Sequence, residues 1–326
     1  SLTEVGGEPG DFALSPAALH DVHARRLAQS PHTMTALSTH DTKRAEDVRA
    51  RISVISELPQ EWGAAVRRWK RFAPLGDGAL ANLLWQAIVG AWPIERDRLH
   101  AFAEKAAREA GVSTAWIDPD AAFEQRLHAL VDAVYDDAEL SADVSAMAAR
   151  LTGPGWSNSL SAKLIQLVAP GVPDVYQGTE LWDRSLVDPD NRRPVDYARR
   201  IELLARLDEG WLPPVDESGA AKLLVTSRAL RLRRDRADLF DGYAPVDVDG
   251  AAAEHLFAFD RGGALAVATR LPVGLAAAGG WRDTVLHLPP GDWHDELTGR
   301  PVESQHVPVV ELLDRYPVAL LVRAVS

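Results

Sequence analysis

The start of the chain combines a helical pattern, a strand-like run and a second helical pattern. Ser15 and Pro16 form a typical helix start, because serine caps the first turn and proline fits the first helical position. Apolar spacing continues this helix to about Gln29. The β-branched, apolar run at residues 33–39 predicts a short buried strand, and helical spacing resumes at residues 48–55. This alternation predicts a parallel α/β arrangement.

Residues 60–150 carry a different pattern. Their apolar residues recur at helical spacing, and the segments stop at prolines and glycines. Strand-like runs and hairpin turns are absent from this part of the sequence. The pattern predicts a helical bundle inserted between two pieces of the α/β unit.

The α/β pattern returns beyond residue 156 and then gives way to short strands. It predicts a helix at 157–168, a strand at 172–176, a polar loop at 188–194 and a helix at 197–207. A further helix is predicted at 220–234. Four later segments are interpreted as alternating strands separated by glycine turns: His255–Phe259, Ala264–Thr269, Thr284–Leu288 and Val318–Val322. Such closely spaced short strands predict an antiparallel β domain at the C-terminus.

Composition and charge exclude several classes of protein. The 35 Lys and Arg against 47 Asp and Glu give a formal charge of −12, which argues against a nucleic-acid partner. The absence of cysteine excludes disulfides, thiolate nucleophiles and cysteine-based zinc sites. No apolar run reaches the length of about 18 residues that a membrane helix needs, and the first residues do not resemble a signal peptide. We therefore expect a cytoplasmic globular protein with no membrane partner, and its start in a glycine- and proline-rich loop without methionine suggests a piece of something longer.

The pair His40-Asp41 follows the first predicted strand. In parallel α/β folds, catalytic groups gather at the carboxyl ends of strands, and the cations Lys43 and Arg44 can keep a carboxylate ionised there. The alternative is that Asp41 caps the next helix while Lys43 and Arg44 are solvated. Both interpretations are compatible with the local pattern.

A second polar segment follows the next predicted strand. Asp190, Asn191, Arg192 and Arg193 lie in the loop 188–194, and such side chains suit a hydroxyl-rich ligand. The alternative is a surface turn rich in proline and aspartate. Glu180 is interpreted as a residue that orients the end of the strand rather than as a second reactive carboxylate.

Tryptophan and histidine offer further candidates. The tryptophans at 62, 69, 85 and 92 have helical spacing and are expected to pack in the bundle core. Trp116 and Trp182 lie in predicted loops and are better candidates for stacking on a sugar. His20 and His23 share a helix without a third ligand, so we expect surface histidines rather than a metal site, and no cofactor is predicted.

These segments resemble a known family. The run Ser38–Arg44, continued by Glu46–Arg49, resembles the strand-seven motif of the maltooligosyltrehalose synthases, a family in the α-amylase superfamily. Other similar segments are Pro170–Leu181 (strand eight), Asp188–Tyr197 (the following loop), Asn82–Pro93 and Trp116–Pro119 (the helical insertion), and Trp293–Arg300 (the C-terminal β domain). The resemblance covers essentially the whole chain, and its HDTKR and DPDNRRP runs are typical of the synthases rather than of amylases in general.

The resemblance implies an enzyme that rearranges the reducing-end α-1,4 linkage of a maltooligosaccharide into an α,α-1,1 linkage. It implies retaining chemistry with a nucleophilic Asp, an acid/base Glu and a third Asp, and Asp41 matches the third Asp. His40 and Tyr176 would bind the substrate. Lys43 and Arg44, together with Asp190, Asn191, Arg192 and Arg193, would line the reducing-end side.

The same resemblance implies a fold and a missing part. The expected fold class is α/β plus an all-α insertion plus an all-β domain. Its parts are the last strands of a (β/α)8 barrel at 1–58 and 153–212, a helical insertion at 59–152 and an antiparallel β-sandwich at 213–326. The nucleophile and the acid/base belong to strands four and five of the family, upstream of this sequence. We therefore expect an incomplete active site and, as partners, the N-terminal barrel portion or another copy of the chain.

Two other functions remain open at this point. One is a maltooligosaccharide-binding module that uses Trp116, Trp182 and the loop at 188–194. The other is a different hydrolase or transferase of the α-amylase superfamily.

Overall fold

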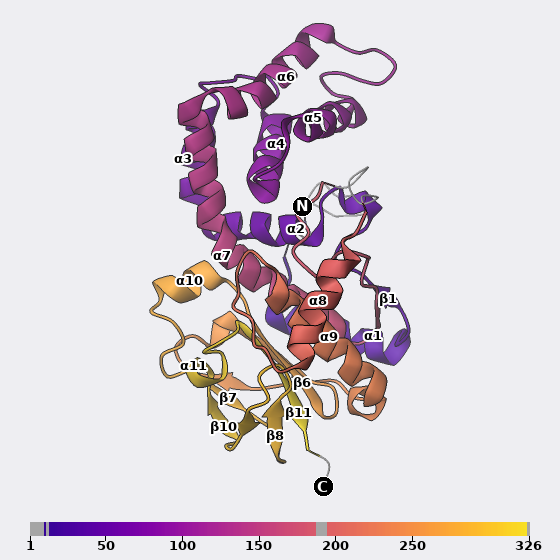
Figure 1. Ribbon diagram of the computed structural model, residues 1–326. Helices are drawn as coiled ribbons and strands as arrows, with labels where there is room; N and C mark the ends of the chain where they lie inside the picture. Colours follow the sequence, from indigo (N-terminus) through magenta and orange to yellow (C-terminus); the bar gives the residue numbers. More distant parts are fainter. Residues whose placement is uncertain (1–9, 11–12, 187–193, 325–326) are drawn as a thin grey trace. The chain divides into compact units, whose positions relative to one another are not determined.

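The computed structural model describes residues 10, 13–186 and 194–324 (Figure 1). The chain divides into two compact units. Unit 1 comprises Ser1–Thr42, Trp156–Asp183 and Arg193–Ser326, whereas unit 2 comprises Lys43–Gly155 and Arg184–Arg192. Helix α7 (Ala138–Val168) contributes residues to both units, so the helix predicted at 157–168 is the second half of a longer one.

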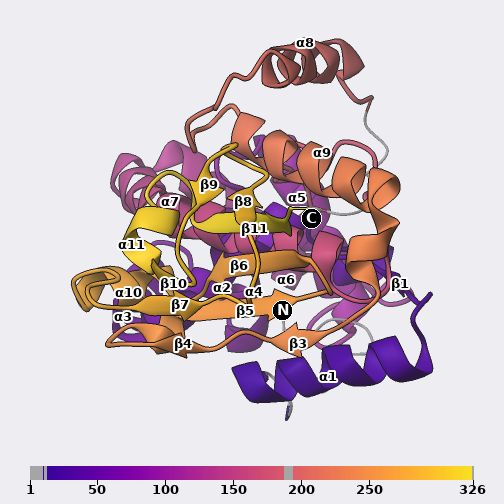
Figure 2. The same ribbon diagram turned by 90° about the horizontal axis from the view of Figure 1, so that it is seen from below.

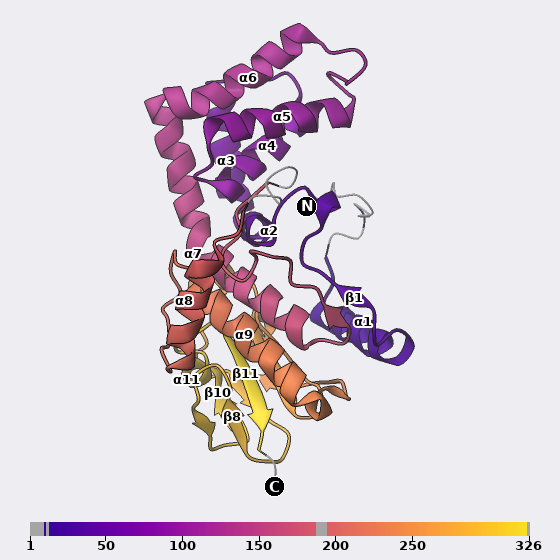
Figure 3. The same ribbon diagram turned by 45° about the vertical axis from the view of Figure 1, so that its right-hand side comes forward.

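Unit 2 is built from helices, as the sequence predicts for this part of the chain. Its described helices are α2 (Glu46–Ser53), α3 (Pro59–Trp69), α4 (Gly78–Ala91), α5 (Arg96–Ala110), α6 (Ala121–Asp136) and the first part of α7. Helices α5 and α6 lie side by side (Figure 3). The predicted core packing of the tryptophans is confirmed for Trp62, Trp69 and Trp85, whose exposed fractions are 9%, 0% and 0%, while Trp92 is half-buried.

The helices of unit 1 begin where the sequence predicts. Helix α1 (Pro16–Gln29) starts after Ser15, whose Oγ accepts a hydrogen bond from the amide of Ala18 at 3.1 Å. Helices α8 (Tyr197–Asp208) and α9 (Ala220–Asp235) also match the predicted ranges to within a residue at each end. Side-chain caps at Ser15 and Asp196 mark the starts of α1 and α8, and apolar spacing defines all three helices locally.

Two short strands of unit 1 form a parallel pair. Strand β1 (Met34–Thr35) pairs with β2 (Val172–Pro173), with Met34 opposite Val172. The expectation that residues 33–39 form a buried strand is wrong, because the strand has two residues and the side chain of Met34 is 69% exposed. In the described part of the chain this pair has no further strand on either side. No neighbouring strand therefore shields the side chains of Met34 and Val172 from solvent.

The antiparallel pairing predicted for the C-terminal strands is confirmed. A six-stranded sheet has the order β3-β5-β6-β11-β8-β9, and a three-stranded sheet has the order β10-β7-β4. The strands are β3 (Ala244–Pro245), β4 (Val248–Asp249), β5 (Leu256–Asp260), β6 (Ala264–Thr269), β7 (Val285–His287), β8 (Trp293–Asp295), β9 (Pro301–Val302), β10 (His306–Pro308) and β11 (Val318–Arg323). Short helices α10 (Pro272–Ala277) and α11 (Val309–Leu312) complete the domain.

The central strands of the large sheet are buried on both faces. One hydrophobic cluster joins Phe259 of β5 and Leu320 of β11 to helices α7, α8 and α9. A second cluster joins Leu265 of β6 and Leu321 of β11 to Leu286 of β7 in the small sheet. Figure 2 shows the strands of this sheet one above the other in unit 1, with α1 alongside β3. Because both faces are covered, the alternation of apolar and polar residues is weak in these strands.

None of the described helices combines the length and the apolar composition that crossing a bilayer requires.

Candidate functional site

Asp41 lies in a tight turn after β1. It belongs to the 3-10 turn His40–Thr42, which Thr42 closes through hydrogen bonds with Thr39. The hydroxyl of Thr42 donates to the carbonyl oxygen of Thr39 at 2.8 Å and accepts from the amide of Thr39 at 3.2 Å. Asp41 is exposed. The turn therefore presents the Asp41 carboxylate outward.

The alternative role of Asp41 as a helix cap is wrong. Helix α2 begins at Glu46, its N-cap residue is Ala45, and no side chain caps it. Among the residues that the structure describes, the Asp41 carboxylate has no hydrogen bond or ion pair. A carboxylate without a structural partner is available to a ligand.

The ends of the two parallel strands are held together by one glutamine. Gln166 of α7 donates from Nε2 to the carbonyl oxygens of Thr35 at 3.0 Å and of Asp174 at 2.8 Å. The segments that carry Asp41 and Tyr176 both leave this same end of the strand pair. Tyr176 is 42% exposed. Within unit 1 the structure thus brings two predicted site segments to one strand end, as expected for parallel α/β folds.

Glu180 has the orienting role that the sequence favours. Its Oε2 accepts hydrogen bonds from the amide of Gly178 at 3.0 Å and from Nε of Arg200 at 3.0 Å. Arg200 also donates to the carbonyl oxygen of Gly178 at 2.6 Å. Gly178 has a φ of +92°, which favours glycine. Glu180 and Arg200 therefore brace the turn that follows Tyr176.

Lys43 and Arg44 belong to unit 2, where they meet a segment far away in the sequence. Arg44 forms an antiparallel bridge with Leu186, and the amide of Ala45 donates to the carbonyl oxygen of Ser185 at 3.0 Å. Arg44 is 4% exposed, so the idea that it is solvated is wrong. Lys43 is half-buried, and its Nζ lies 4.0 Å from Oε2 of Glu109. Leu186 is the last described residue before the predicted loop, so this two-stranded ladder joins residues 44–45 to the segment that precedes that loop.

Four predicted residues cannot be located. Asp190, Asn191, Arg192 and Arg193 lie outside the described residues. Their assignment to the reducing-end side of the site stays a prediction.

The two candidate tryptophans differ in their surroundings. Trp182 stacks on Trp156, with ring centroids 5.8 Å apart, and its Nε1 donates to the carbonyl oxygen of Asp216 at 2.7 Å. Trp116 is 56% exposed, and the guanidinium of Arg108 covers its ring at 5.1 Å. Trp182 is therefore engaged in packing, whereas Trp116 stays accessible.

The expectation of surface histidines on α1 is wrong. His23 is 3% exposed and lies edge-on to Phe257 and Phe259, while His20 stacks on Phe257 at 4.4 Å and its Nδ1 lies 2.7 Å from the hydroxyl of Tyr243. Burial lowers the pKa of His23 to about 4, with the positive charges of Arg26 and Arg261 adding to the effect. Both histidines therefore serve to dock α1 on the β domain.

A second histidine pair lies in unit 2. His100 and His128 face each other with Nδ1 atoms 2.8 Å apart, and Nε2 of His100 lies 2.9 Å from Asp132. No group of three or more potential metal ligands occurs within residues 10, 13–186 and 194–324. We interpret the pair as a hydrogen-bonded contact between α5 and α6.

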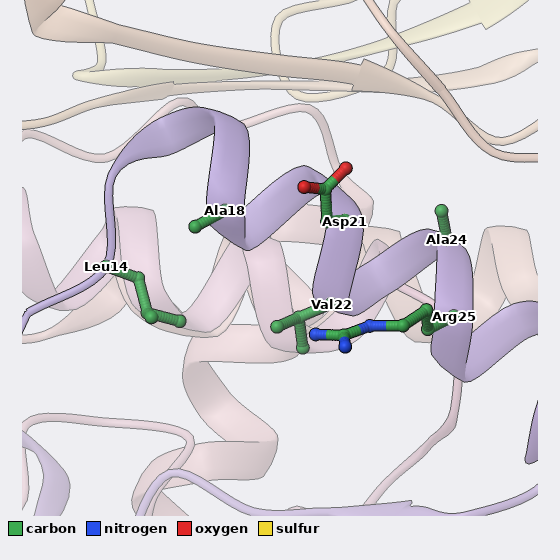
Figure 4. Close-up of a pocket in the computed structure, with 6 residues that line it drawn as sticks. All are labelled: Leu14, Ala18, Asp21, Val22, Ala24 and Arg25. Atoms are coloured by element: carbon green, nitrogen blue, oxygen red, sulfur yellow. The ribbon is translucent and has the colours of Figure 1, made fainter. Parts of the chain in front are cut away.

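A hollow of about 400 Å³ lies on the outer face of α1. Its lining consists of Leu14, Ala18, Asp21, Val22, Ala24 and Arg25 (Figure 4). These residues come from α1 and the residue before its cap, and none of them is a predicted site residue. The hollow therefore does not correspond to the site at the strand ends.

Comparisons with known proteins agree with the sequence resemblance. No protein-family model matches the chain. It is 46% identical, over 99% of its length, to proteins named putative maltooligosyl trehalose synthase from two strains of Mycobacterium tuberculosis, of which it covers 42%. Its fold superimposes on the maltooligosyltrehalose synthase of Arthrobacter ramosus with a TM-score of 0.96 and 58% identity, covering 99% of this chain and 43% of that one. For a structure named DSM5389 glycosyltrehalose synthase the TM-score is 0.84 at 30% identity, covering 99% of this chain and 42% of that one.

Sequence and fold therefore relate the chain to trehalose-forming synthases. Within this class it is a homologue of the maltooligosyl trehalose synthases and corresponds to their C-terminal part. The chain spans less than half the length of the relatives it matches.

Proposed function

We propose that this chain carries part of the active site of a maltooligosyltrehalose synthase. The whole enzyme would convert the reducing-end α-1,4 linkage of a maltooligosaccharide into an α,α-1,1 linkage by intramolecular glucosyl transfer. The observation that supports this most directly is the exposed Asp41 carboxylate after strand β1, which has no partner among the residues that the structure describes. The chain that carries it is homologous to these synthases along its length.

The fold that we propose for the whole enzyme is a (β/α)8 barrel. In it, β1 and β2 would be the last two barrel strands, the helices of unit 2 the insertion and the two antiparallel sheets the C-terminal domain. The parallel pairing of β1 with β2 and the exposure of Met34 and Val172 support this proposal, because such a pair is marginal by itself. The other strands would come from an N-terminal barrel portion outside the sequence of this chain.

The proposed chemistry is retaining. Two carboxyl groups about 5–5.5 Å apart perform such a reaction, one as the nucleophile and one as the acid/base. We propose that both are supplied by the N-terminal portion and that Asp41 is the third carboxylate. An anionic group facing the sugar ring would stabilise the positive charge that develops in the oxocarbenium-like transition state.

Polar residues around Asp41 would then hold the substrate. His40 and Tyr176 are proposed to bind sugar hydroxyls, and Lys43 and Arg44 to line the reducing-end side. The same side is proposed for Asp190, Asn191, Arg192 and Arg193. The cytoplasm is the proposed location, and no cofactor is required by this chemistry.

A conversion assay tests the function. The chain alone should produce no non-reducing product from maltopentaose, whereas the intact enzyme that contains this sequence should convert it to a trehalose-ended product. Conversion by the chain alone would show that its catalytic set is complete. Absence of conversion by the intact enzyme would refute the proposed activity.

A maltooligosaccharide-binding role is a second candidate, favoured by the accessible ring of Trp116. Calorimetry with maltopentaose, on the chain and on its Trp116→Ala variant, distinguishes the binding role from the catalytic role. Micromolar binding that the variant loses, without turnover in the intact enzyme, would favour the binding module.

A further inference from the structure

Helix α5 contacts the segment that follows Asp41 through Glu109 and contacts the bridge partner of that segment through Arg98. Arg98 is 8% exposed, and its Nη2 donates to the carbonyl oxygen of Leu186 at 2.8 Å. Leu186 is the bridge partner of Arg44. Glu109, also on α5, lies 4.0 Å from Nζ of Lys43. Arg98 is thus linked to Arg44 through a single residue.

The backbone at Lys43 requires this support. Its φ is +58°, a left-handed conformation that side chains other than glycine and asparagine adopt at a cost. Such a residue persists only where the surrounding structure holds it in place. On one side of Lys43 lies the Thr39–Thr42 turn, and on the other lies the ladder between residues 44–45 and 185–186.

That ladder is too short to be stable by itself. It includes an isolated bridge and an adjacent backbone hydrogen bond, and short two-stranded pairs are marginal in water. Arg98 adds a charged hydrogen bond from a helix that is itself fixed in the core of unit 2 by Leu99 and Phe102, which are 0% and 6% exposed. A long charged side chain that is almost fully buried and donates to the carbonyl oxygen of Leu186 is well suited to such a role.

We propose that Arg98 is a positioning residue of the synthase, which fixes the backbone of Lys43 and Arg44 through Leu186 and so shapes the reducing-end subsite. This rests on the proposed function. In the rearrangement, the anomeric hydroxyl of the released glucose attacks C1 of the glycosyl ester formed with the nucleophilic carboxylate. Its proton passes to the general base, and the bond between C1 and the carboxylate oxygen breaks, which frees the carboxylate. Water attacks the same carbon in hydrolysis, and free glucose results. A loosened reducing-end subsite therefore shifts the products from rearrangement towards hydrolysis.

Kinetics of Arg98→Met in the intact enzyme test the proposal. We expect KM for maltopentaose to rise about tenfold and the ratio of free glucose to trehalose-ended product to rise several-fold, with kcat changed less than about threefold. Arg98→Lys keeps one charged donor and should recover part of both effects. The control is Arg96→Met on the same helix, because Arg96 is an exposed-face residue that pairs with Asp132 and Asp136, away from this ladder.

Hydrogen exchange on this chain supplies a second readout. The amide of Ala45 bonds to the carbonyl oxygen of Ser185, so its exchange should accelerate at least tenfold in Arg98→Met and stay unchanged in Arg96→Met. Unchanged exchange and an unchanged product ratio in a folded Arg98→Met variant would overturn the proposal. An intact wild-type enzyme without conversion would instead refute the proposed function, and the exchange experiment would still decide whether Arg98 holds the ladder.

Discussion

The hydroxyl of Thr42 donates a hydrogen bond to the carbonyl oxygen of Thr39 at 2.8 Å and thereby closes the turn that presents Asp41. Thr42→Val keeps the shape of the side chain and removes this bond, at a cost of about 1 kcal/mol to the turn. A looser turn would misplace the Asp41 carboxylate. We therefore expect kcat of the intact enzyme to fall up to about tenfold, because an activation barrier higher by about 1.4 kcal/mol lowers the rate by a factor of ten. Thr42→Ser is the matched control and should keep kcat near that of the wild type. A Thr42→Val enzyme with unchanged kcat would show that the turn does not position Asp41.

Asp41→Asn separates a catalytic from a structural carboxylate. The side chain is exposed and has no partner among the described residues, so the melting temperature should stay within about 2 °C of the wild type. Loss of the negative charge near the reacting sugar should lower kcat of the intact enzyme by about two orders of magnitude or more. Thermal unfolding and kinetics on maltopentaose measure both quantities. An unaltered kcat would contradict the assignment of Asp41.

Glu180 provides a contrasting case. Its partner Arg200 also holds the carbonyl oxygen of Gly178, so Arg200→Met should destabilise the chain by about 1–3 kcal/mol. Glu180→Gln can still accept a hydrogen bond from Arg200, and we expect the intact enzyme to keep at least about a tenth of its kcat. Urea unfolding and kinetics check the two expectations. Loss of nearly all activity in a stable Glu180→Gln enzyme would mean that Glu180 is a reacting carboxylate after all.

Burial of His23 makes the stability of unit 1 depend on pH. The folded state keeps the ring neutral, with a pKa of about 4 against 6.5 in the unfolded chain. Between these values the unfolded state binds more protons, so stability falls as the pH drops from about 6.5 to 4, by up to roughly 3 kcal/mol. At pH above 6.5 this contribution is fully present. Urea unfolding at pH 7.5 and 4.5 should show a smaller difference for His23→Gln than for the wild type, and the exposed His32→Gln should behave like the wild type.

The contact between α2 and α4 depends on a glycine. A Cβ added at Gly90 would lie 2.9 Å from side-chain atoms of both Val48 and Ile52. Gly90→Ala should therefore destabilise unit 2 by about 1–3 kcal/mol through overpacking. Gly78 begins the same helix with open space around its Cβ position, so Gly78→Ala should be neutral or stabilising by a few tenths of a kcal/mol. Chemical unfolding measures the stabilities of the two variants. Equal stabilities would contradict the close packing at Gly90.

The elements that the sequence predicts well are those defined by local chemistry. Ser15 and Pro16 mark the start of α1, and Gly262 and Gly263 mark the start of β6. The exposure of Met34 could not be predicted, because apolar β-branched runs normally indicate burial and only the pairing with β2 shows how little covers this strand. The burial of His23 depends on Phe257 and Phe259, which are remote in the sequence, so no local pattern indicates it.

In the candidate site, too, the features set by local sequence could be predicted, whereas those that depend on distant residues could not. The position of Asp41 after a strand could be predicted, and threonines three residues apart are a recognisable signal for the turn that holds it. The ladder between Arg44 and Leu186 could not be predicted, because a single bridge between distant segments leaves no periodic pattern. Arg98 was missed for a related reason, since an arginine on a helix is normally solvated and its buried state depends on tertiary packing.

The ladder at Ala45 and Ser185 also bears on the order of folding. Closing it joins residues separated by the whole helical bundle, and the chain entropy lost in such a closure is regained only once the intervening helices have packed. We therefore expect the conformation around Lys43 to be acquired late, after the bundle has formed. In refolding experiments, helical circular dichroism should recover first and the ability to recognise sugar should follow it.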